Sequence, residues 1–439
     1  MKIAFNPLPS PGHLNPTTVL ARKLASRGHE VAIVGLADVR PLVEGVGLPF
    51  IPCCEDVYPA GTIPKILRNL SQMSPPDAAE YVIRSRGIQT ESMLKSMPKV
   101  YEREGIEAVV LDSYDVFREV LPLTMGMPYA QVACAAHFDF SGQTPLCLFD
   151  SPFANTPDAV KRNRKSTERI VKLYAEAHNS VREQGTKVGI DWENPAATFS
   201  NLAFVTQMPL EFDFIKLQLC DSFRYAGPLH ESEGRVDADF PWDRLTGEPI
   251  VYASLGTVAN GNTQVFRMII DAVKRRKAVQ LILSIGNNIE REQLGSVPQT
   301  AIVLKYVPQI EVLRKASLCV THAGLNTVLE SLAKGVPQVA IPISHDQPGV
   351  GARIMANRTG TIVPLVELSA DRLTAGISEV MENPIYRSNS RHFEKLMEER
   401  NGLEMAADIL EEAFQAKTSA SPMTQAEMEI NYLPRFFVS

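Results

Sequence analysis

Residues 306–347, YVPQIEVLRKASLCVTHAGLNTVLESLAKGVPQVAIPISHDQ, contain the pattern from which the fold is predicted. The apolar run 316–320 predicts a strand, a helical pattern starts after Gly324, and Gly335 suits the end of that helix. The apolar run 336–341 then predicts a second strand. The stretch is therefore a strand, turn, helix, strand unit of an α/β protein.

Polar residues of this unit gather where the first strand ends and the helix begins. His322, Asn326 and Thr327 stand at this junction. Free N–H groups and the helix dipole favour an anion at such a place, and Gly324 lets a ligand approach the backbone closely. The junction therefore predicts a binding site for an anion such as a diphosphate.

The order of polar residues over the whole stretch resembles the nucleotide-sugar signature of family 1 UDP-dependent glycosyltransferases, which have the GT-B fold. The matching parts are a Y-x-P-Q opening, a T-H-x-G-x-N-T-x-x-E centre and a D-Q close. The resemblance implies that Tyr306 stacks on uracil, that Gln309 lies near the ribose or base, and that Glu330 binds the ribose hydroxyls. It also implies that the diphosphate is surrounded by His322, Gly324, Asn326 and Thr327. The sugar hydroxyls would be bound by Asp346 and Gln347.

A second glycine turn follows the apolar run 250–255, which predicts another strand. Gly256 and Thr257 form this turn, and residues 254–257, SLGT, resemble the family's loop whose N–H groups reach the diphosphate. Taken singly, an Asn at a helix start is often a cap and a helical Glu is often solvated. The hypothesis of a donor site therefore rests on the joint spacing.

The amino-terminal residues predict a second unit of the same kind. Strand 2–5 precedes a breaker-rich loop at 7–12, PLPSPG, after which Asn15 suits a helix N-cap and Pro16 the first helical position. A strand at 31–34 follows the helix. Such a unit builds a parallel sheet whose ligand side lies at the carboxyl ends of the strands.

His13 lies on this ligand side, where a lone histidine is commonly a packed residue. Residues 12–16, GHLNP, nevertheless resemble the family's G-H-x-x-P segment, whose histidine is the general base for the acceptor's proton. Asp112 follows the buried strand predicted at 108–111. The resemblance implies that Asp112 hydrogen-bonds His13 and stabilises the imidazolium. A helix cap is the alternative role for Asp112, and both roles are compatible.

Composition excludes several classes of protein. Hydrophobic residues at 45% and charged residues at 21% are typical of a globular protein, and the net charge of -6 argues against a nucleic-acid partner. The six cysteines form no C-x-x-C pair or zinc-like array, so we expect reduced thiols, no metal and no cofactor besides the donor substrate. Without a long apolar run or a signal-like start, a cytoplasmic location is expected.

The 439 residues are too many for one core and suggest two or three domains. The resemblance implies two doubly wound, Rossmann-like α/β domains of GT-B type that face each other across a cleft. The expected divisions are 1–229 for an acceptor domain, 230–243 for a charged linker, 244–415 for a UDP-sugar domain and 416–439 for a tail. The triplet DAD at 237–239 falls in the linker, and we interpret it as solvated rather than metal-binding.

Residues 53–97 predict an irregular segment because prolines interrupt it. Apolar side chains in and after this segment are candidates for the acceptor site. They are Cys53, Cys54, Met73, Met93, Cys134, Phe138 and Phe140. For each of them, filling the hydrophobic core is at least as good an explanation. As a set they suit a large hydrophobic alcohol or phenol.

These expectations combine into an inverting transfer of glucose from UDP-glucose to a hydroxyl of a carotenoid, polyketide or flavonoid-like phenol. Gln347 resembles the glucose-accepting form of the family, and residues 346–350, DQPGV, are similar to bacterial zeaxanthin-type glucosyltransferases, relatives of macrolide glycosyltransferases. A lipophilic acceptor implies weak membrane association. The alternatives are a UDP-sugar epimerase, which would leave His13 and Asp112 without a purpose, and a non-catalytic nucleotide-sugar-binding subunit.

Overall fold

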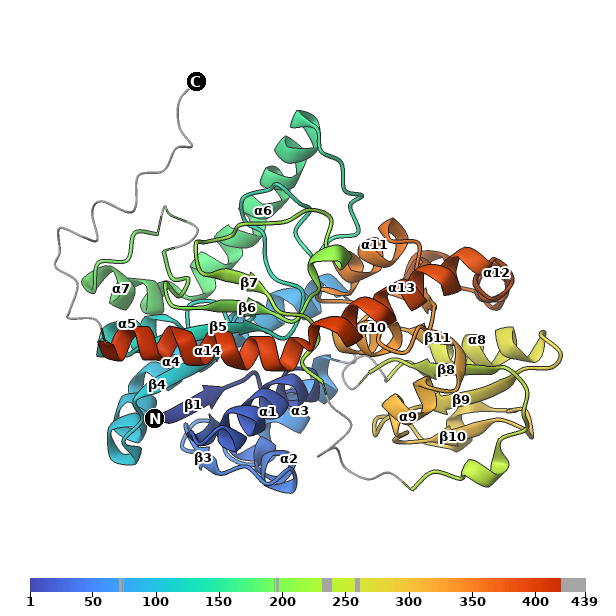
Figure 1. Cartoon of the computed structure of the whole chain (residues 1–439), viewed down its shortest axis with the longest axis horizontal. Coiled ribbons are helices and arrows are strands. Elements are labelled where there is room, and N and C mark those ends of the chain that lie inside the picture. The colour runs from blue at the N-terminus through green and yellow to red at the C-terminus, as the bar shows by residue number, and fades with distance from the viewer. Residues whose placement is uncertain are drawn as a thin grey trace.

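The computed structural model describes residues 1–70, 73, 75–192, 194, 197–230, 239–256 and 261–419. These residues form two parallel sheets, one with the strand order β3-β2-β1-β4-β5-β6-β7 and one with the order β10-β9-β8-β11-β12-β13. Helices cover both sheets, and Figure 1 shows the two α/β domains side by side. The predicted pair of doubly wound domains is therefore present.

The first sheet contains β1 (Lys2–Asn6), β2 (Glu30–Gly35), β3 (Phe50–Pro52), β4 (Ala108–Asp112), β5 (Tyr129–Ala133), β6 (Phe204–Thr206) and β7 (Phe223–Tyr225). Its helices are α1 (Pro11–Ser26), α2 (Arg40–Gly45), α3 (Thr62–Leu70), α4 (Pro75–Glu104), α5 (Val120–Met125), α6 (Pro157–Ala177) and α7 (Asn179–Lys187). Strands such as β4 and β5 are buried along their whole length, as expected for a parallel sheet covered on both faces.

The second sheet contains β8 (Ile250–Ser254), β9 (Gln280–Ser284), β10 (Ile302–Leu304), β11 (Ala316–Thr321), β12 (Gln338–Ala340) and β13 (Gly360–Ile362). Its helices are α8 (Thr263–Lys274), α9 (Gln309–Leu313), α10 (Leu325–Leu332), α11 (Gln347–Ala356), α12 (Ala370–Glu382) and α13 (Pro384–Arg400). The unit β11, α10, β12 follows the order predicted from residues 306–347.

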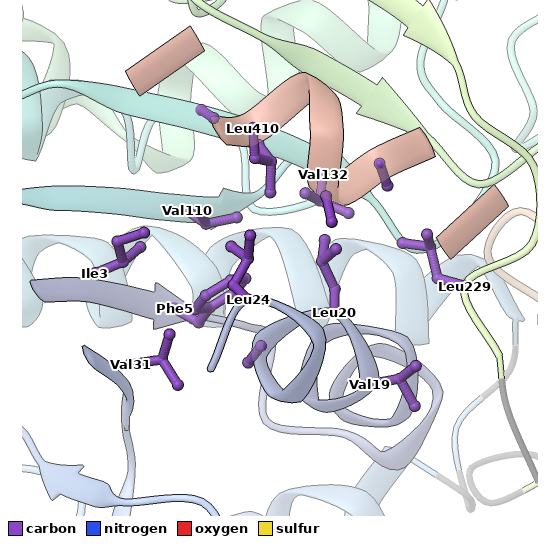
Figure 2. Close-up of a cluster of buried hydrophobic side chains, with 14 of the residues drawn as sticks. Ile3, Phe5, Val19, Leu20, Leu24, Val31, Val110, Val132, Leu229 and Leu410 are labelled. Carbon is purple, nitrogen blue, oxygen red and sulfur yellow. The ribbon is translucent and has the colours of Figure 1, made fainter. Parts of the chain in front are cut away.

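The last described helix, α14 (Gly402–Ser419), returns to the first domain (Figure 1). Its Leu410 lies in the same hydrophobic cluster as Leu20 and Leu24 of α1 (Figure 2). Arg27, the C-cap residue of α1, also forms ion pairs with Glu404 and other carboxylates of α14. By its contacts α14 thus belongs with the first sheet, whereas the sequence grouped residues up to 415 with the second.

Helix α1 begins one turn earlier than predicted. Pro11 occupies its first turn with Ser10 as the N-cap residue, while Asn15 and Pro16 lie inside the helix. The prediction of Asn15 as the cap was therefore wrong, because Pro11 satisfies the preference for proline at a helix start equally well. As a consequence His13 stands in the first helical turn, at the carboxyl edge of the sheet.

The prediction that residues 53–97 are irregular is also wrong. It contains α3 and most of the 30-residue helix α4. Pro75 and Pro76 stand at the start of α4, where a missing N–H breaks no helical hydrogen bond, so they begin a helix instead of interrupting one. Of the linker predicted at 230–243, residues 231–238 lie outside the described part, as do residues 420–439 of the predicted tail.

A hydrophobic cluster and a buried ion pair join the two domains. Phe138 and Phe212 of the first domain share a buried cluster with Leu325 and Val328 of the second. Nearby, Arg353 of α11 donates from Nε and Nη2 to Oδ1 of Asp213 at 2.9 and 2.7 Å. Arg353 is 1% exposed and Asp213 7% exposed, so neither charge can be satisfied by bulk water.

Asp213 has further donors that keep it ionised. The Tyr225 hydroxyl donates to its Oδ2 at 2.8 Å, and His137 Nε2 lies 3.2 Å from the same oxygen. Burial alone would raise the pKa of Asp213, but Arg353 and His137 lower it well below its usual value. The lowered pKa of Asp213 keeps its carboxylate charged opposite Arg353, and the ion pair attaches α11 to the first domain.

We expect Arg353→Ala to lower the free energy of unfolding by about 3–5 kcal/mol, because Asp213 would remain buried without its counter-charge. Urea unfolding followed by circular dichroism measures this change. The matched control is Arg372→Ala, which removes an exposed ion pair with Glu367 and should cost less than about 1 kcal/mol. Equal effects of the two substitutions would contradict the role given to Arg353.

Among the described residues, no helix is both long and apolar enough to cross a bilayer.

Candidate active site

His13 and Asp112 meet at the carboxyl edge of the first sheet. Nδ1 of His13 lies 2.6 Å from Oδ2 of Asp112. The backbone N–H of Tyr114 donates to Oδ1 of the same carboxylate at 3.0 Å, so Asp112 also orders the turn after β4. Of the two roles that the sequence left open for Asp112, the structure thus has the contact with His13, whereas the helix cap is wrong, because α5 begins only at Val120 with Glu119 as its N-cap residue.

The ionisation of Asp112 determines the tautomer of His13. Burial would raise the pKa of Asp112, but the neighbouring His13 and the N–H groups of Tyr114 and Leu8 lower it overall. An ionised Asp112 can only accept, so Nδ1 of His13 carries the proton. The lone pair of Nε2 is then available to accept a proton from another molecule.

An aromatic wall extends from His13 along the first domain. The ring of Tyr114 lies 5.5 Å from that of His13 and 4.7 Å from Phe138, measured between centroids. Phe138 in turn lies 5.6 Å from Phe140 and 6.4 Å from Tyr174. Phe138 and Phe140 were predicted for the acceptor side, whereas Tyr114 and Tyr174 were missed. For Tyr114 the available signal was its position two residues after Asp112.

The remaining candidates for the acceptor side lie elsewhere. Cys53, Cys54 and Met93 are buried in the hydrophobic cluster beneath α4, and Cys134 lies in the core beside α1. Met73 is 36% exposed, ahead of α4. Of the seven candidates, the structure therefore places only Phe138 and Phe140 in the row of rings that begins at His13.

On the second domain, His322 lies between two glycines. A Cβ atom built on Gly256 would lie 2.6 Å from the imidazole of His322, and one built on Gly324 would lie 2.5 Å from its Nε2. Both positions thus require glycine for packing against His322, in addition to any close approach of a ligand. Burial lowers the pKa of His322 to about 4, so its imidazole is neutral at pH 7. Thr257 lies outside the described residues.

Helix α10 leaves its first turn available to an anion. Its N-cap residue is Gly324, which offers no side-chain hydrogen bond to the first-turn N–H groups. Asn326 lies inside this turn and is not the cap, so the alternative of a simple capping role is excluded. Unsatisfied N–H groups and the helix dipole favour negative charge here.

A chain of hydrogen bonds joins the residues predicted for the ribose and base. Nε2 of Gln309 donates to Oε2 of Glu330 at 2.6 Å, and the Tyr252 hydroxyl donates to Oε1 of Gln309 at 2.7 Å. Gln309 Nε2 also lies 3.4 Å from the Thr327 hydroxyl. Tyr252, which the sequence reading missed, therefore fixes the orientation of the Gln309 amide.

Tyr306 lies at the rim of this group. It is 56% exposed, although large aromatic side chains are usually buried. Its hydroxyl accepts a hydrogen bond of 2.6 Å from Nδ2 of Asn287. The ring thus has a fixed edge and an open surface on which a planar group can stack.

Asp346 and Gln347 stand at the start of α11 with part of their hydrogen-bonding capacity already used. Oδ2 of Asp346 accepts from the backbone N–H of Ala136 in the first domain at 2.9 Å. Oε1 of Gln347 accepts from the N–H groups of Ile343 and Ser344, both at 2.8 Å. Gln347 therefore has its Nε2 donors left for a ligand.

No group of three or more His, Cys, Asp or Glu side chains suited to a metal ion occurs within the described ranges.

Comparison with known proteins identifies the donor signature. Residues 243–403 match the family described as UDP-glucoronosyl and UDP-glucosyl transferase. The chain is 24% identical over 406 residues to a zeaxanthin glucosyltransferase of Pantoea ananas, covering 92% of this chain and 93% of the relative. It is 26% identical over 424 residues to the NDP-glycosyltransferase YjiC of Bacillus subtilis (strain 168), covering 94% and 97%.

The fold is similar to that of solved glycosyltransferases. CalG4, the calicheamicin glycosyltransferase, aligns with a TM-score of 0.71 and 19% identity over 96% of this chain and 99% of that structure. Two facing α/β domains, the matched second domain and relatives along nearly the whole chain give one conclusion. The chain is a glycosyltransferase of the GT-B fold, and its residues 243–403 match the UDP-glucoronosyl and UDP-glucosyl transferase family.

Proposed function

We propose that this glycosyltransferase transfers glucose from UDP-glucose to a hydroxyl of a bulky hydrophobic small molecule, with inversion at the anomeric carbon. The observation that carries the proposal is the hydrogen bond between His13 and Asp112, which leaves Nε2 of His13 as a base. The acceptor would lie along the aromatic wall, with its hydroxyl at His13. The donor would bind at the facing edge of the second domain.

In the proposed reaction, Nε2 of His13 takes the proton of the acceptor hydroxyl while the oxygen attacks the anomeric carbon. The bond between that carbon and the diphosphate oxygen breaks with its electron pair leaving on UDP. A single displacement of this kind inverts the configuration. Asp112 would stabilise the imidazolium formed on His13, because it already accepts from Nδ1.

The leaving diphosphate would be stabilised by the first turn of α10 and by a neutral N–H of His322. A backbone N–H near Gly256, and Thr257 beyond it, would add to this stabilisation of the diphosphate charge. Preorganised donors of this kind supply charge stabilisation without a metal ion, so the proposal includes none. In the same proposal Tyr306 stacks on uracil and Glu330 binds the ribose hydroxyls.

The acceptor class is inferred from the aromatic wall and from the relatives. Tyr114 and Phe140 are half-buried rings that rest on the buried Phe138, and their apolar surfaces favour a large unsaturated or aromatic molecule. One relative named above is described as a zeaxanthin glucosyltransferase, and the structural neighbour as the calicheamicin glycosyltransferase. A lipophilic acceptor of this class would bring weak association with membranes.

All six cysteines are unpaired, which is typical of a reducing compartment. We therefore place the enzyme in the cytoplasm within this proposal.

We expect His13→Ala to reduce turnover by about 10²–10⁴-fold, because the acceptor would lose its general base. The affinity for UDP-glucose should stay near normal, since His13 belongs to the other domain. Acceptor-dependent release of UDP measures turnover, and calorimetry measures donor binding.

Asp112→Asn is the companion variant. An asparagine can hold Nδ1 of His13 in the wrong tautomer, so the turnover of this variant should also fall. Full activity of His13→Ala would refute the assignment.

For the donor, we expect a higher kcat/KM with UDP-glucose than with UDP-galactose or a dTDP-sugar. Gln347 can offer only its Nε2 donors, because backbone N–H groups occupy its Oε1. Kinetics with the three donors and one hydrophobic acceptor measure this preference. A clear preference for UDP-galactose or a dTDP-sugar would count against it.

The affinity for UDP-glucose should be constant between about pH 5.5 and 8. Burial lowers the pKa of His322, the histidine at the proposed diphosphate site, to about 4, so it is neutral throughout this window. Calorimetric titrations across the window measure the affinity. If a histidine cation bound the diphosphate, the affinity would instead rise as the pH falls, and a tenfold rise would contradict the neutral assignment.

A further inference from the structure

Pro16 leaves one carbonyl of α1 without its helical partner. In an α-helix the N–H of residue 16 would donate to the carbonyl of Gly12, but proline has no N–H and its ring displaces that carbonyl. The carbonyl instead accepts a hydrogen bond from Nδ2 of Asn326, in the first turn of α10. The turn that carries His13 is thus bonded to the opposite domain.

A second contact fixes which way the Asn326 amide points. Nε2 of Gln207, in the segment after β6, donates to Oδ1 of Asn326 at 2.7 Å. The same Nε2 group donates to the carbonyl of Cys134 at the end of β5, so both of its hydrogens are used. Gln207 is 2% exposed, which leaves it little freedom to turn. The oxygen of Asn326 therefore faces Gln207, and its nitrogen faces Gly12.

This orientation leaves one N–H of Asn326 uncommitted by these contacts. A primary amide has two N–H donors, and Gly12 takes one of them. The other belongs to a side chain of the first turn of α10, where uncapped backbone N–H groups favour an anion. If the amide were reversed, its oxygen would face both the Gly12 carbonyl and the anion, and both contacts would be repulsive.

We propose that Asn326 is a positioning residue that ties the donor's diphosphate to the turn carrying His13, with Gln207 as the residue that orients its amide. The inference rests on the proposed function, because the diphosphate and the base are those of the transfer reaction. One amide then holds the donor and the base at a fixed separation. Since a misplacement of about 1 Å can cost 10²-fold in rate, this separation matters for turnover.

The first test is Pro16→Ala, which restores the N–H that the Gly12 carbonyl lacks. The helix should become no less stable, because proline in a helix interior is unfavourable. We expect an unchanged or higher melting temperature, an affinity for UDP within about twofold of the parent, and a kcat lower by about tenfold or more. A purely structural role of Pro16 would not combine a stable fold with a selective loss of kcat. An unchanged kcat would overturn the tie to His13.

The second test is a double-mutant cycle on UDP binding, measured by calorimetry without an acceptor. Gln207→Met keeps the length of the side chain but cannot donate, so the affinity for UDP should fall by roughly 2- to 10-fold. In an Asn326→Ala background the same substitution should have no further effect, because Gln207 acts through Asn326. Additive losses would show that Gln207 acts independently and would overturn its orienting role.

Asn15→Ala serves as the control, since Asn15 is exposed on the same turn of α1. It should leave the melting temperature, the affinity for UDP and kcat near the parent values. The two tests separate this inference from the proposed function. If the parent transfers no sugar to any acceptor, the proposed function fails, whereas the binding cycle with UDP still decides the orienting role of Gln207.

Discussion

Parallel strands bring all of their carboxyl ends to one edge of a sheet, and in this protein two such edges have to face each other. At the first edge this constraint brings together Asp112, from the end of β4, and His13, from the helix after β1. At the second edge it places His322 and the first turn of α10 after β11. Neither edge holds a complete site, so the chemistry depends on the contacts that keep the domains facing each other.

The places of the proposed donor residues in the fold could be predicted because these residues lie in one continuous stretch around a single strand, turn, helix unit. There the local spacing already determines which side chains share an edge, as for Asn326 and Glu330. The acceptor side could not be predicted in this way. Tyr114, Phe138 and Tyr174 come from separate segments, and they meet only through tertiary packing. The same packing places Met93 in the core, where composition alone had made it a candidate.

The errors at the helix starts have a common physical cause. Proline suits the first turn of a helix and also interrupts helices, so a sequence rich in proline allows several starting points. At Pro11 and Pro75 the residues that were interpreted as loop begin helices. At Pro16 the expected start is an interior position, and the lost hydrogen bond reappears as a contact between domains. The rule that proline starts a helix thus failed at Pro16, where Asn326 of the other domain donates to the carbonyl of Gly12 that proline leaves without a helical partner.

The contacts between the domains are of two kinds, and their positions differ. Away from His13, the Arg353 and Asp213 pair is buried with additional donors, so breaking it would leave charges without solvent. Beside the proposed donor site, the Asn326 amide donates a single hydrogen bond to the carbonyl of Gly12, and the Asp346 carboxylate accepts one from the N–H of Ala136. A ligand phosphate forms charge-assisted hydrogen bonds that are stronger than neutral ones, so a bound donor would supplement these contacts. The geometry therefore combines a fixed attachment at one side with a ligand-sensitive one at the cleft.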